Sequence, residues 1–202
     1  MSADSKKLYL ISCGTGEGNI TLRALEAIKT CGILLGAERL AAQYAPQAVV
    51  TPADALKAAD IINDSREISV GILLSGDAGF HSLATKLRPM VKNREIITIP
   101  GVGVVQSAAA RLNTAWQGMD FISLHASGVA QAEFAPSRSY MILTRKGLKV
   151  EEFLDSALLN DYEIWIMEKL YSEGERICPW DGEPFECRDL TVVVLVSKQY
   201  PA

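Results

Sequence analysis

Short apolar runs alternate with helix-like segments along the first half of the chain. Apolar runs without polar alternation predict buried strands at 8–12, 33–35, 68–74 and 96–99. Apolar residues at helical spacing predict helices at 19–31, 52–63, 82–88 and 104–112. This alternation is typical of a mostly parallel sheet covered by helices, with the binding loops at the carboxyl edge of the sheet. We expect Asn19 to cap the first helix, and Leu56 and Ile62 to face inward from the second.

The pattern changes after residues 113–118, a segment with neither helical nor strand periodicity. Beyond it, strands are predicted at 121–124, 140–143, 164–167 and 191–196, with one helix at 150–159. Because strands outnumber helices here, the second half is expected to form a mixed sheet. The sequence therefore predicts an α/β protein of two domains, 1–114 and 115–202, with the glycine turns in the first.

Composition narrows the choice of partners. The 202 residues are 49% hydrophobic and 22% charged, with a net charge of −4. A chain of this length can form one large domain or two small ones, each with a core. An acidic chain has no general attraction for nucleic acid or anionic membranes, so we expect neither as a partner. No apolar run approaches the ~20 residues that a membrane span needs.

Cysteine and histidine are too scattered to indicate a metal site. They lack CxxC and paired-histidine spacing and stand at Cys13, Cys31, His81, His125, Cys178 and Cys187. A disulfide between Cys178 and Cys187 is the alternative to free thiols, but nothing else marks the chain as secreted. We expect reduced cysteines and a cytoplasmic protein without a metal.

Three segments end an apolar run in glycines: Ile11–Gly18 (the first turn), Ser75–Phe80 (the second turn) and Ile99–Val105 (the third turn). Glycine lets the backbone approach a ligand closely, so three such turns suggest one shared crevice. The dinucleotide and P-loop phosphate motifs are absent. A purely structural role stays open for the first turn. In the second turn, Asp77 can either cap a helix or accept hydrogen bonds from a ligand.

The combination of motifs resembles the tetrapyrrole methylase family, S-adenosylmethionine-dependent enzymes that methylate ring carbons of cobalamin and sirohaem precursors. The matching stretches are 12–16 with Ile20-Thr21 behind them, 36–40, 75–80, 99–112 with Trp116, and 123–126. The chain departs from the family pattern at two positions. Ser12 replaces the first glycine of the G-x-G-P-G turn, and Ala78 replaces the proline of Gly-Asp-Pro, so we expect altered cofactor affinity.

The resemblance implies a cofactor, S-adenosyl-L-methionine, folded in a cleft between two α/β domains and released as S-adenosyl-L-homocysteine. By motif position, its contacts would be Gly14, Thr15, Gly76, Asp77, Phe80, Gly103, Val104, Leu143, Thr144 and Met167. The resemblance further implies a homodimer. A separate decarboxylating methyltransferase of the same pathway is a further expected partner.

Within the family, the likeness is strongest to members that methylate C5 of precorrin-7 or cobalt-precorrin-7. The corrinoid substrate carries acetate and propionate groups, for which we expect Arg111 and Arg145 as partners. His125 is the candidate base for the proton that C5 loses, although a structural role is the alternative. Two other functions stay open: methylation at another ring carbon, and a non-catalytic corrinoid-binding subunit.

Overall fold

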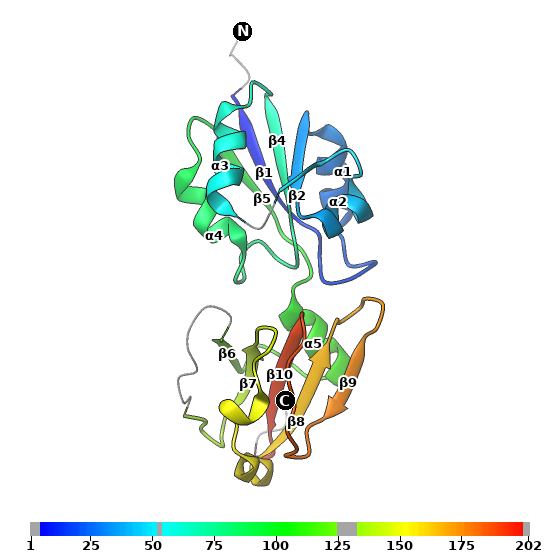
Figure 1. Ribbon diagram of the computed structural model, residues 1–202, viewed down its shortest axis with the longest axis vertical. Helices are drawn as coiled ribbons and strands as arrows, with labels where there is room; N and C mark the ends of the chain where they lie inside the picture. The colour runs from blue at the N-terminus through cyan, green and yellow to red at the C-terminus, as the bar shows by residue number, and fades with distance from the viewer. Residues whose placement is uncertain (1–4, 52–53, 125–132, 200–202) are drawn as a thin grey trace. The chain divides into compact units, whose positions relative to one another are not determined.

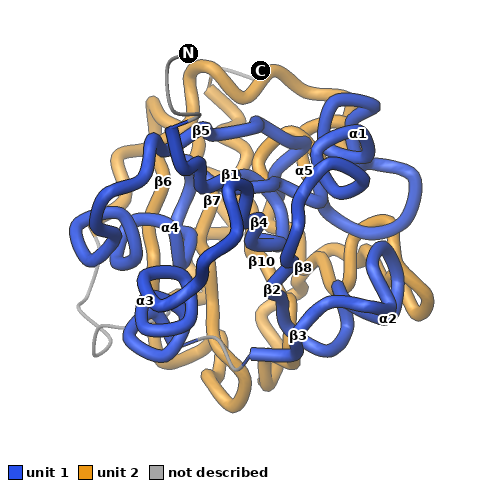
Figure 2. The backbone as a smooth tube through the Cα atoms, turned by 90° about the horizontal axis from the view of Figure 1, so that it is seen from above, with its two compact units in different colours: residues 1–104 blue, residues 105–202 orange. Residues whose placement is uncertain are grey.

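The computed structural model describes residues 5–51, 54–124 and 133–199. The chain divides into two compact units, 1–104 and 105–202 (Figures 1 and 2). Each unit has a five-stranded sheet of its own. The predicted domain boundary at 114/115 differs from this division by the position of one helix, and it stays a prediction.

The first unit contains a fully parallel sheet in the order β3-β2-β4-β1-β5. Its strands are β1 (Lys7–Ser12), β2 (Ile33–Gly36), β3 (Val49–Val50), β4 (Ser69–Leu74) and β5 (Glu95–Ile99). The mostly parallel sheet expected from the alternating pattern is confirmed. Because β4, β1 and β5 are adjacent and parallel, the three glycine turns leave the sheet side by side.

Helices cover both faces of this sheet (Figure 1). They are α1 (Leu22–Thr30), α2 (Glu38–Tyr44), α3 (Ala55–Asp64) and α4 (Leu83–Leu87), followed by the 3₁₀ turn η1 (Arg88–Met90). Alternate residues of β1 separate the two cores: Leu8 and Leu10 pack with α3 and α4, and Ile11 packs with α1 and α2. The periodicity missed α2, which is only seven residues long.

Helix starts differ from two sequence expectations. The N-cap of α1 is Thr21, whose hydroxyl accepts from the Ala24 N–H, and not Asn19. The N-cap of α3 is Asp54. Leu56 was expected to face inward, but it is 62% exposed, because the buried face of α3 is built from small alanines and Ile62.

The second unit contains a mixed sheet in the order β6-β7-β10-β8-β9, as expected. Its strands are β6 (Met119–Ser123), β7 (Ser139–Leu143), β8 (Tyr162–Glu168), β9 (Arg176–Pro179) and β10 (Thr191–Ser197). Only β6 and β7 pair in parallel, and the remaining pairs are antiparallel. The helix α5 (Val104–Leu112) has the bounds that its periodicity predicts.

The helix predicted at 150–159 is wrong. Two 3₁₀ segments stand there, η2 (Val150–Glu152) and η3 (Ser156–Asn160). The Val150 N–H donates to the Phe185 carbonyl at 2.8 Å, which draws the start of the segment toward another loop. Asp155 then accepts from the Ala157 N–H at 2.8 Å, and such a side-chain bond restarts the chain in a tight turn. These two hydrogen bonds compete with the pattern of a continuous α-helix, and two short 3₁₀ segments form in its place.

All four cysteines are free thiols, including Cys178 and Cys187. Among the described residues, every helix is too short or too polar to cross a membrane.

Candidate functional site

The first and second turns are joined directly through their backbones. The Gly14 N–H donates to the Gly76 carbonyl at 3.2 Å, and the Gly76 N–H donates to the Gly14 carbonyl at 2.9 Å. Both residues have positive φ, +77° and +66°, a conformation that residues with a Cβ rarely adopt. Glycine at these two positions therefore allows the backbone conformation in which the two turns hydrogen-bond to each other.

The Asp77 carboxylate ties the second turn to the third. Its Oδ2 accepts from the Gly101 N–H at 2.9 Å, and its Oδ1 accepts from the Gly79 N–H at 2.7 Å. Helix α4 is capped by Ser82, so helix capping is not the role of Asp77. Each carboxylate oxygen has a second lone pair, which leaves Asp77 able to accept from a ligand as well.

Thr15 connects the first turn to the third, because its hydroxyl donates to the Val102 carbonyl at 3.2 Å. Two side chains that are not part of the first turn donate hydrogen bonds to its carbonyl groups. Asn19 donates to the Thr15 carbonyl at 2.7 Å, and Tyr44 donates to the Gly16 carbonyl at 3.2 Å. Burial raises the pKa of Tyr44, so its hydroxyl stays a donor at neutral pH. All three turns are therefore fixed to one another.

Gly101 makes the closest approach in this cluster. A Cβ added to it would lie 2.7 Å from the Ser12 Cβ and 3.0 Å from the Gly76 carbonyl oxygen. A Cβ added to Gly76 would lie 3.8 Å from the Thr15 Oγ1 and 3.9 Å from the Gly103 Cα, so those backbones also run close together. From the sequence, Gly101 is predicted only as part of the third turn. The structure gives it the contact that only glycine permits.

The two departures from the family pattern contact each other. The Ser12 hydroxyl accepts from the Ala78 N–H at 2.9 Å, and both residues are fully buried. Proline at position 78 would have no N–H to satisfy, and glycine at position 12 would have no hydroxyl. The serine and the alanine therefore compensate one another. The two residues are 66 apart in the chain, so their contact is not visible in the sequence alone.

Phe80 closes the second turn, and its N–H donates to the Asp77 carbonyl at 3.2 Å. Its ring stands edge-on to the His81 ring, with centroids 4.8 Å apart. His81 has φ +45°, an uncommon conformation outside glycine. The third turn leads through Gly103, which is buried, and Val104, which begins α5.

Cys13 lies between Ser12 and Gly14 but is not a nucleophile. Burial raises the pKa of its thiol to about 12. The thiol therefore stays protonated at neutral pH, and only the thiolate is reactive. The chemistry available at this edge comes from backbone groups and the Asp77 carboxylate.

In the second unit, Leu143 and Met167 both pair with Val192 of the strand between them. Residues directly opposite in antiparallel strands share a face, so Leu143 and Met167 lie on one face of the sheet, on either side of Val192. Thr144 is buried, and its hydroxyl donates to the Thr191 carbonyl at 2.8 Å. The three residues expected from this half of the chain thus lie near the same end of the second sheet.

The arginines expected to bind substrate differ in their surroundings. Arg111 forms a bidentate ion pair with the Glu175 carboxylate, in which Nε donates to Oε1 at 2.8 Å and Nη2 donates to Oε2 at 2.7 Å. Its guanidinium carbon also lies 3.9 Å from the centre of the Tyr171 ring. Arg145 follows β7 and is exposed. His125, the candidate base, lies outside the described residues.

Neighbouring strands of the parallel sheet end in interlocked glycine turns, an arrangement typical of α/β proteins that bind small ligands at the carboxyl edge of the sheet. Residues 7–183 match the family model "Tetrapyrrole (Corrin/Porphyrin) Methylases". The chain belongs to this family. The protein is accordingly an S-adenosylmethionine-dependent methyltransferase.

One curated relative is "Probable cobalt-precorrin-7 C(5)-methyltransferase" of Methanocaldococcus jannaschii. It is 24% identical over 186 residues, which cover 84% of this chain and 87% of the relative.

Solved structures share the fold. The cobalamin biosynthesis precorrin-6Y methylase of Archaeoglobus fulgidus matches with a TM-score of 0.76 and 24% identity, covering 95% of this chain and 98% of that one. The uroporphyrin-III C-methyltransferase of Thermus thermophilus, complexed with S-adenyl homocysteine, matches with a TM-score of 0.68 and 14% identity, covering 97% of each chain. The expected tetrapyrrole-methylase-like fold is confirmed.

Proposed function

We propose that this enzyme transfers a methyl group from S-adenosyl-L-methionine to C5 of precorrin-7 or cobalt-precorrin-7 in cobalamin biosynthesis. Membership in the family supports the class of reaction, and the name of the curated relative supports the substrate and the carbon. The observation that carries the proposal is the interlocking of three glycine turns at one edge of the parallel sheet.

The residues at this edge suit such a cofactor. Gly76 and Gly103 present backbone without side chains, and backbone N–H and C=O groups recognise the polar atoms of a nucleoside without added charge. The half-buried Asp77 provides one negative charge for the cationic amino-acid part. Thr15, Gly14, Phe80 and Val104 complete the proposed contacts, with Leu143, Thr144 and Met167 from the second unit.

When bound, S-adenosylmethionine supplies an already activated methyl group, so the protein needs little covalent machinery. The main work of the residues is to align the reacting atoms, and alignment can contribute ~7 to 11 kcal/mol. Turns fixed to one another by Asp77 and Thr15 are suited to this task, because a rigid edge loses little freedom on binding. The released product is S-adenosyl-L-homocysteine.

The substrate contributes carboxylates and a proton. Arg145 is exposed and is proposed to bind a carboxylate of the macrocycle, whereas a carboxylate at Arg111 would compete with Glu175. His125 is proposed as the base that removes the proton from C5. We expect His125→Ala to slow turnover about 10²-fold, and unchanged turnover would contradict this role.

Incubation with a labelled methyl donor and a panel of corrin precursors, followed by mass spectrometry, tests the proposal. One added methyl group on precorrin-7 or its cobalt form is expected, with fragmentation placing it at C5. Methylation of a different precursor would favour the second candidate, another ring carbon, to which the likeness to a uroporphyrin-III methyltransferase fold also points. Binding of a corrinoid without any uptake of S-adenosylmethionine would contradict both candidates and indicate a carrier.

The assembly expected from the family is part of the proposal. One chain has a mass of 21.9 kDa, so light scattering of a homodimer should give twice this mass. Co-purification with a decarboxylating methyltransferase would test the other expected partner.

A further inference from the structure

Arginines gather at one end of the second sheet, around a single buried carboxylate. Thr191, Glu168 and Arg176 stand in register on β10, β8 and β9. Arg188 lies just before β10, and its backbone N–H donates to the Thr191 hydroxyl at 3.0 Å, which fixes it beside this row. Neither Arg176 nor Arg188 belongs to a motif that predicts a site from the sequence.

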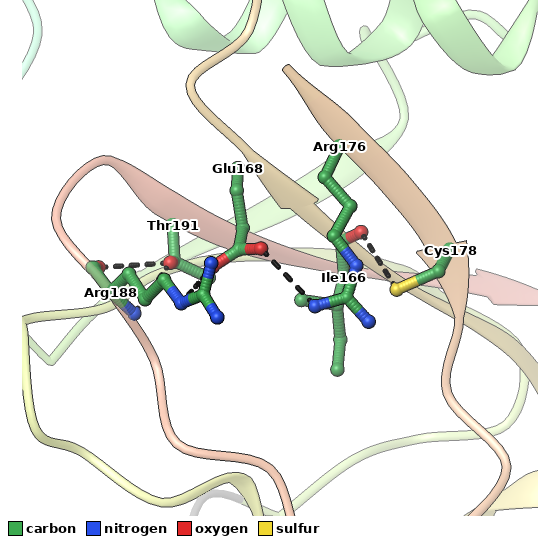
Figure 3. Close-up of polar contacts among 6 residues, drawn as sticks. All are labelled: Ile166, Glu168, Arg176, Cys178, Arg188 and Thr191. Carbon is green, nitrogen blue, oxygen red and sulfur yellow. Dashed lines mark hydrogen bonds and ion pairs between the residues drawn. The ribbon is translucent and has the colours of Figure 1, made fainter. Parts of the chain in front are cut away.

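Glu168 lies between the two guanidinium groups (Figure 3). Its side chain is only 4% exposed, with Oε2 at 3.5 Å from the Arg176 Nη1 and Oε1 at 3.8 Å from the Arg188 Nε. Among the described residues, Oε1 has no hydrogen-bond partner. A buried carboxylate is unfavourable unless charges compensate it, so Glu168 holds both arginines nearby without saturating either.

Most of each guanidinium's binding capacity remains. Arg176 and Arg188 are 50% and 73% exposed, and a guanidinium has five N–H donors. Arg111 is different, because its Nε and Nη2 groups already donate to the two Glu175 carboxylate oxygens, at 2.8 and 2.7 Å. The long contacts to Glu168 are therefore weak ones that an incoming anion can supplement.

The local charge favours an anion. Two arginines face one buried carboxylate, and Arg145 follows the neighbouring strand β7 at the same end of the sheet, since Thr144 donates to the Thr191 carbonyl. Of the carboxylates next in sequence, Glu175 is already paired with Arg111 at 2.7 Å, and within the described part of the chain Glu186 and Asp189 form no ion pair with Arg176 or Arg188. The chain as a whole is acidic, so a cationic end of a sheet stands out.

We propose that Arg176 and Arg188, positioned by Glu168, bind the carboxylate side chains of the tetrapyrrole substrate. This inference rests on the proposed function, which requires a macrocycle with several acetate and propionate groups. Each arginine presents a planar guanidinium that fits a carboxylate, and two guanidinium groups beside one buried anion suit a ligand with more than one carboxylate.

Titration with uroporphyrin, a stable macrocycle bearing several carboxylates, tests the inference without requiring turnover. Arg176→Gln and Arg188→Gln should each weaken binding about tenfold, and added salt should weaken wild-type binding more than variant binding. Arg138→Gln is the matched control. It removes the same charge from the same sheet, but Arg138 precedes β7 at the other end and pairs with Asp120 at 2.6 Å, so uroporphyrin affinity should stay at the wild-type value.

Loss of an arginine leaves Glu168 with less compensation, so each change is also made together with Glu168→Gln. Weaker uroporphyrin binding in both backgrounds supports the inference, and wild-type affinity in folded variants overturns it. Calorimetry with S-adenosylmethionine separates this result from the proposed function. If the wild type binds the cofactor while the arginine variants bind uroporphyrin normally, only the inference fails. If the wild type takes up no cofactor, the proposed function fails.

Discussion

The proposed binding sites of the two units differ in the groups that they offer to a ligand. The glycine turns of the first unit present backbone, and one carboxylate, Asp77, joins two of them. The sheet end of the second unit presents arginine side chains around the buried Glu168. Binding to exposed backbone requires close approach and is lost when an added methyl group blocks that approach. Binding to charged side chains depends on the opposite charge of the ligand and weakens when one of the charges is removed. Substitutions in the two units should therefore weaken binding for different physical reasons.

Gly101→Ala is expected to have the largest effect. Its Cβ would meet the Ser12 Cβ at 2.7 Å and the Gly76 carbonyl at 3.0 Å, so the backbone must move. We expect a loss of about 3 kcal/mol in the free energy of unfolding and a more than tenfold loss of S-adenosylmethionine affinity. Urea unfolding and calorimetry measure these. Gly118→Ala is the control, because a Cβ there meets nothing within 4 Å. Equal results for the two variants would contradict the close-approach argument.

Asp77→Ala should have the next largest effect. It removes the acceptor for the Gly101 and Gly79 N–H groups, at 2.9 and 2.7 Å, and unties the second turn from the third. We expect about 2 kcal/mol of lost stability and about tenfold weaker cofactor binding. Asp77→Asn keeps an oxygen acceptor and should be intermediate in both measurements. Full stability of Asp77→Ala would show that the carboxylate does not join the turns.

Ser12→Gly and Ala78→Pro should each destabilise the protein by about 1 kcal/mol, because each alone leaves one half of the Ser12 to Ala78 hydrogen bond without its partner. The double variant should lose less than the sum of the two, and urea unfolding of all four proteins completes the cycle. Strictly additive losses would mean that the two departures from the family pattern are independent.

Glu175→Gln is expected to have the smallest effect, and it depends on pH. Burial alone would raise the pKa of Glu175, but the hydrogen bonds from the Arg111 guanidinium and the Tyr171 N–H, together with the positive charge of Arg111, outweigh burial and hold the pKa below its usual value. The pair therefore stabilises the fold above the ordinary carboxyl pKa of ~4.3, and this contribution disappears as the pH falls through the lower native value. Wild type and variant should differ in unfolding temperature at pH 7 and converge near pH 3.

The alternating pattern predicted the parallel sheet well, because buried strands and amphipathic helices differ in period. The bounds of α5 follow directly from its spacing. Elements governed by distant contacts were not predictable. β9 contains Arg176 and Pro179 and lacks a strand pattern, but it pairs with β8. The helix predicted at 150–159 does not form, because the Val150 N–H donates to the Phe185 carbonyl and the Ala157 N–H donates to the Asp155 carboxylate.

For the candidate site, glycine spacing was enough to predict that the three turns meet, since adjacent parallel strands end at one edge. The roles of side chains were harder to predict. Whether Asp77 caps a helix or joins turns depends on where Gly101 lies, 24 residues away. The Ser12 to Ala78 compensation and the setting of Glu168 likewise appear only once the strands are in register.

The central claim is that interlocked glycine turns bind the methyl donor. Amide NMR of the labelled protein during titration with S-adenosylhomocysteine tests it most directly. The account predicts saturable shifts that are largest at Gly14, Thr15, Gly76, Asp77, Gly103 and Val104. Saturable binding that leaves these amides unmoved, or no binding at all, would contradict it.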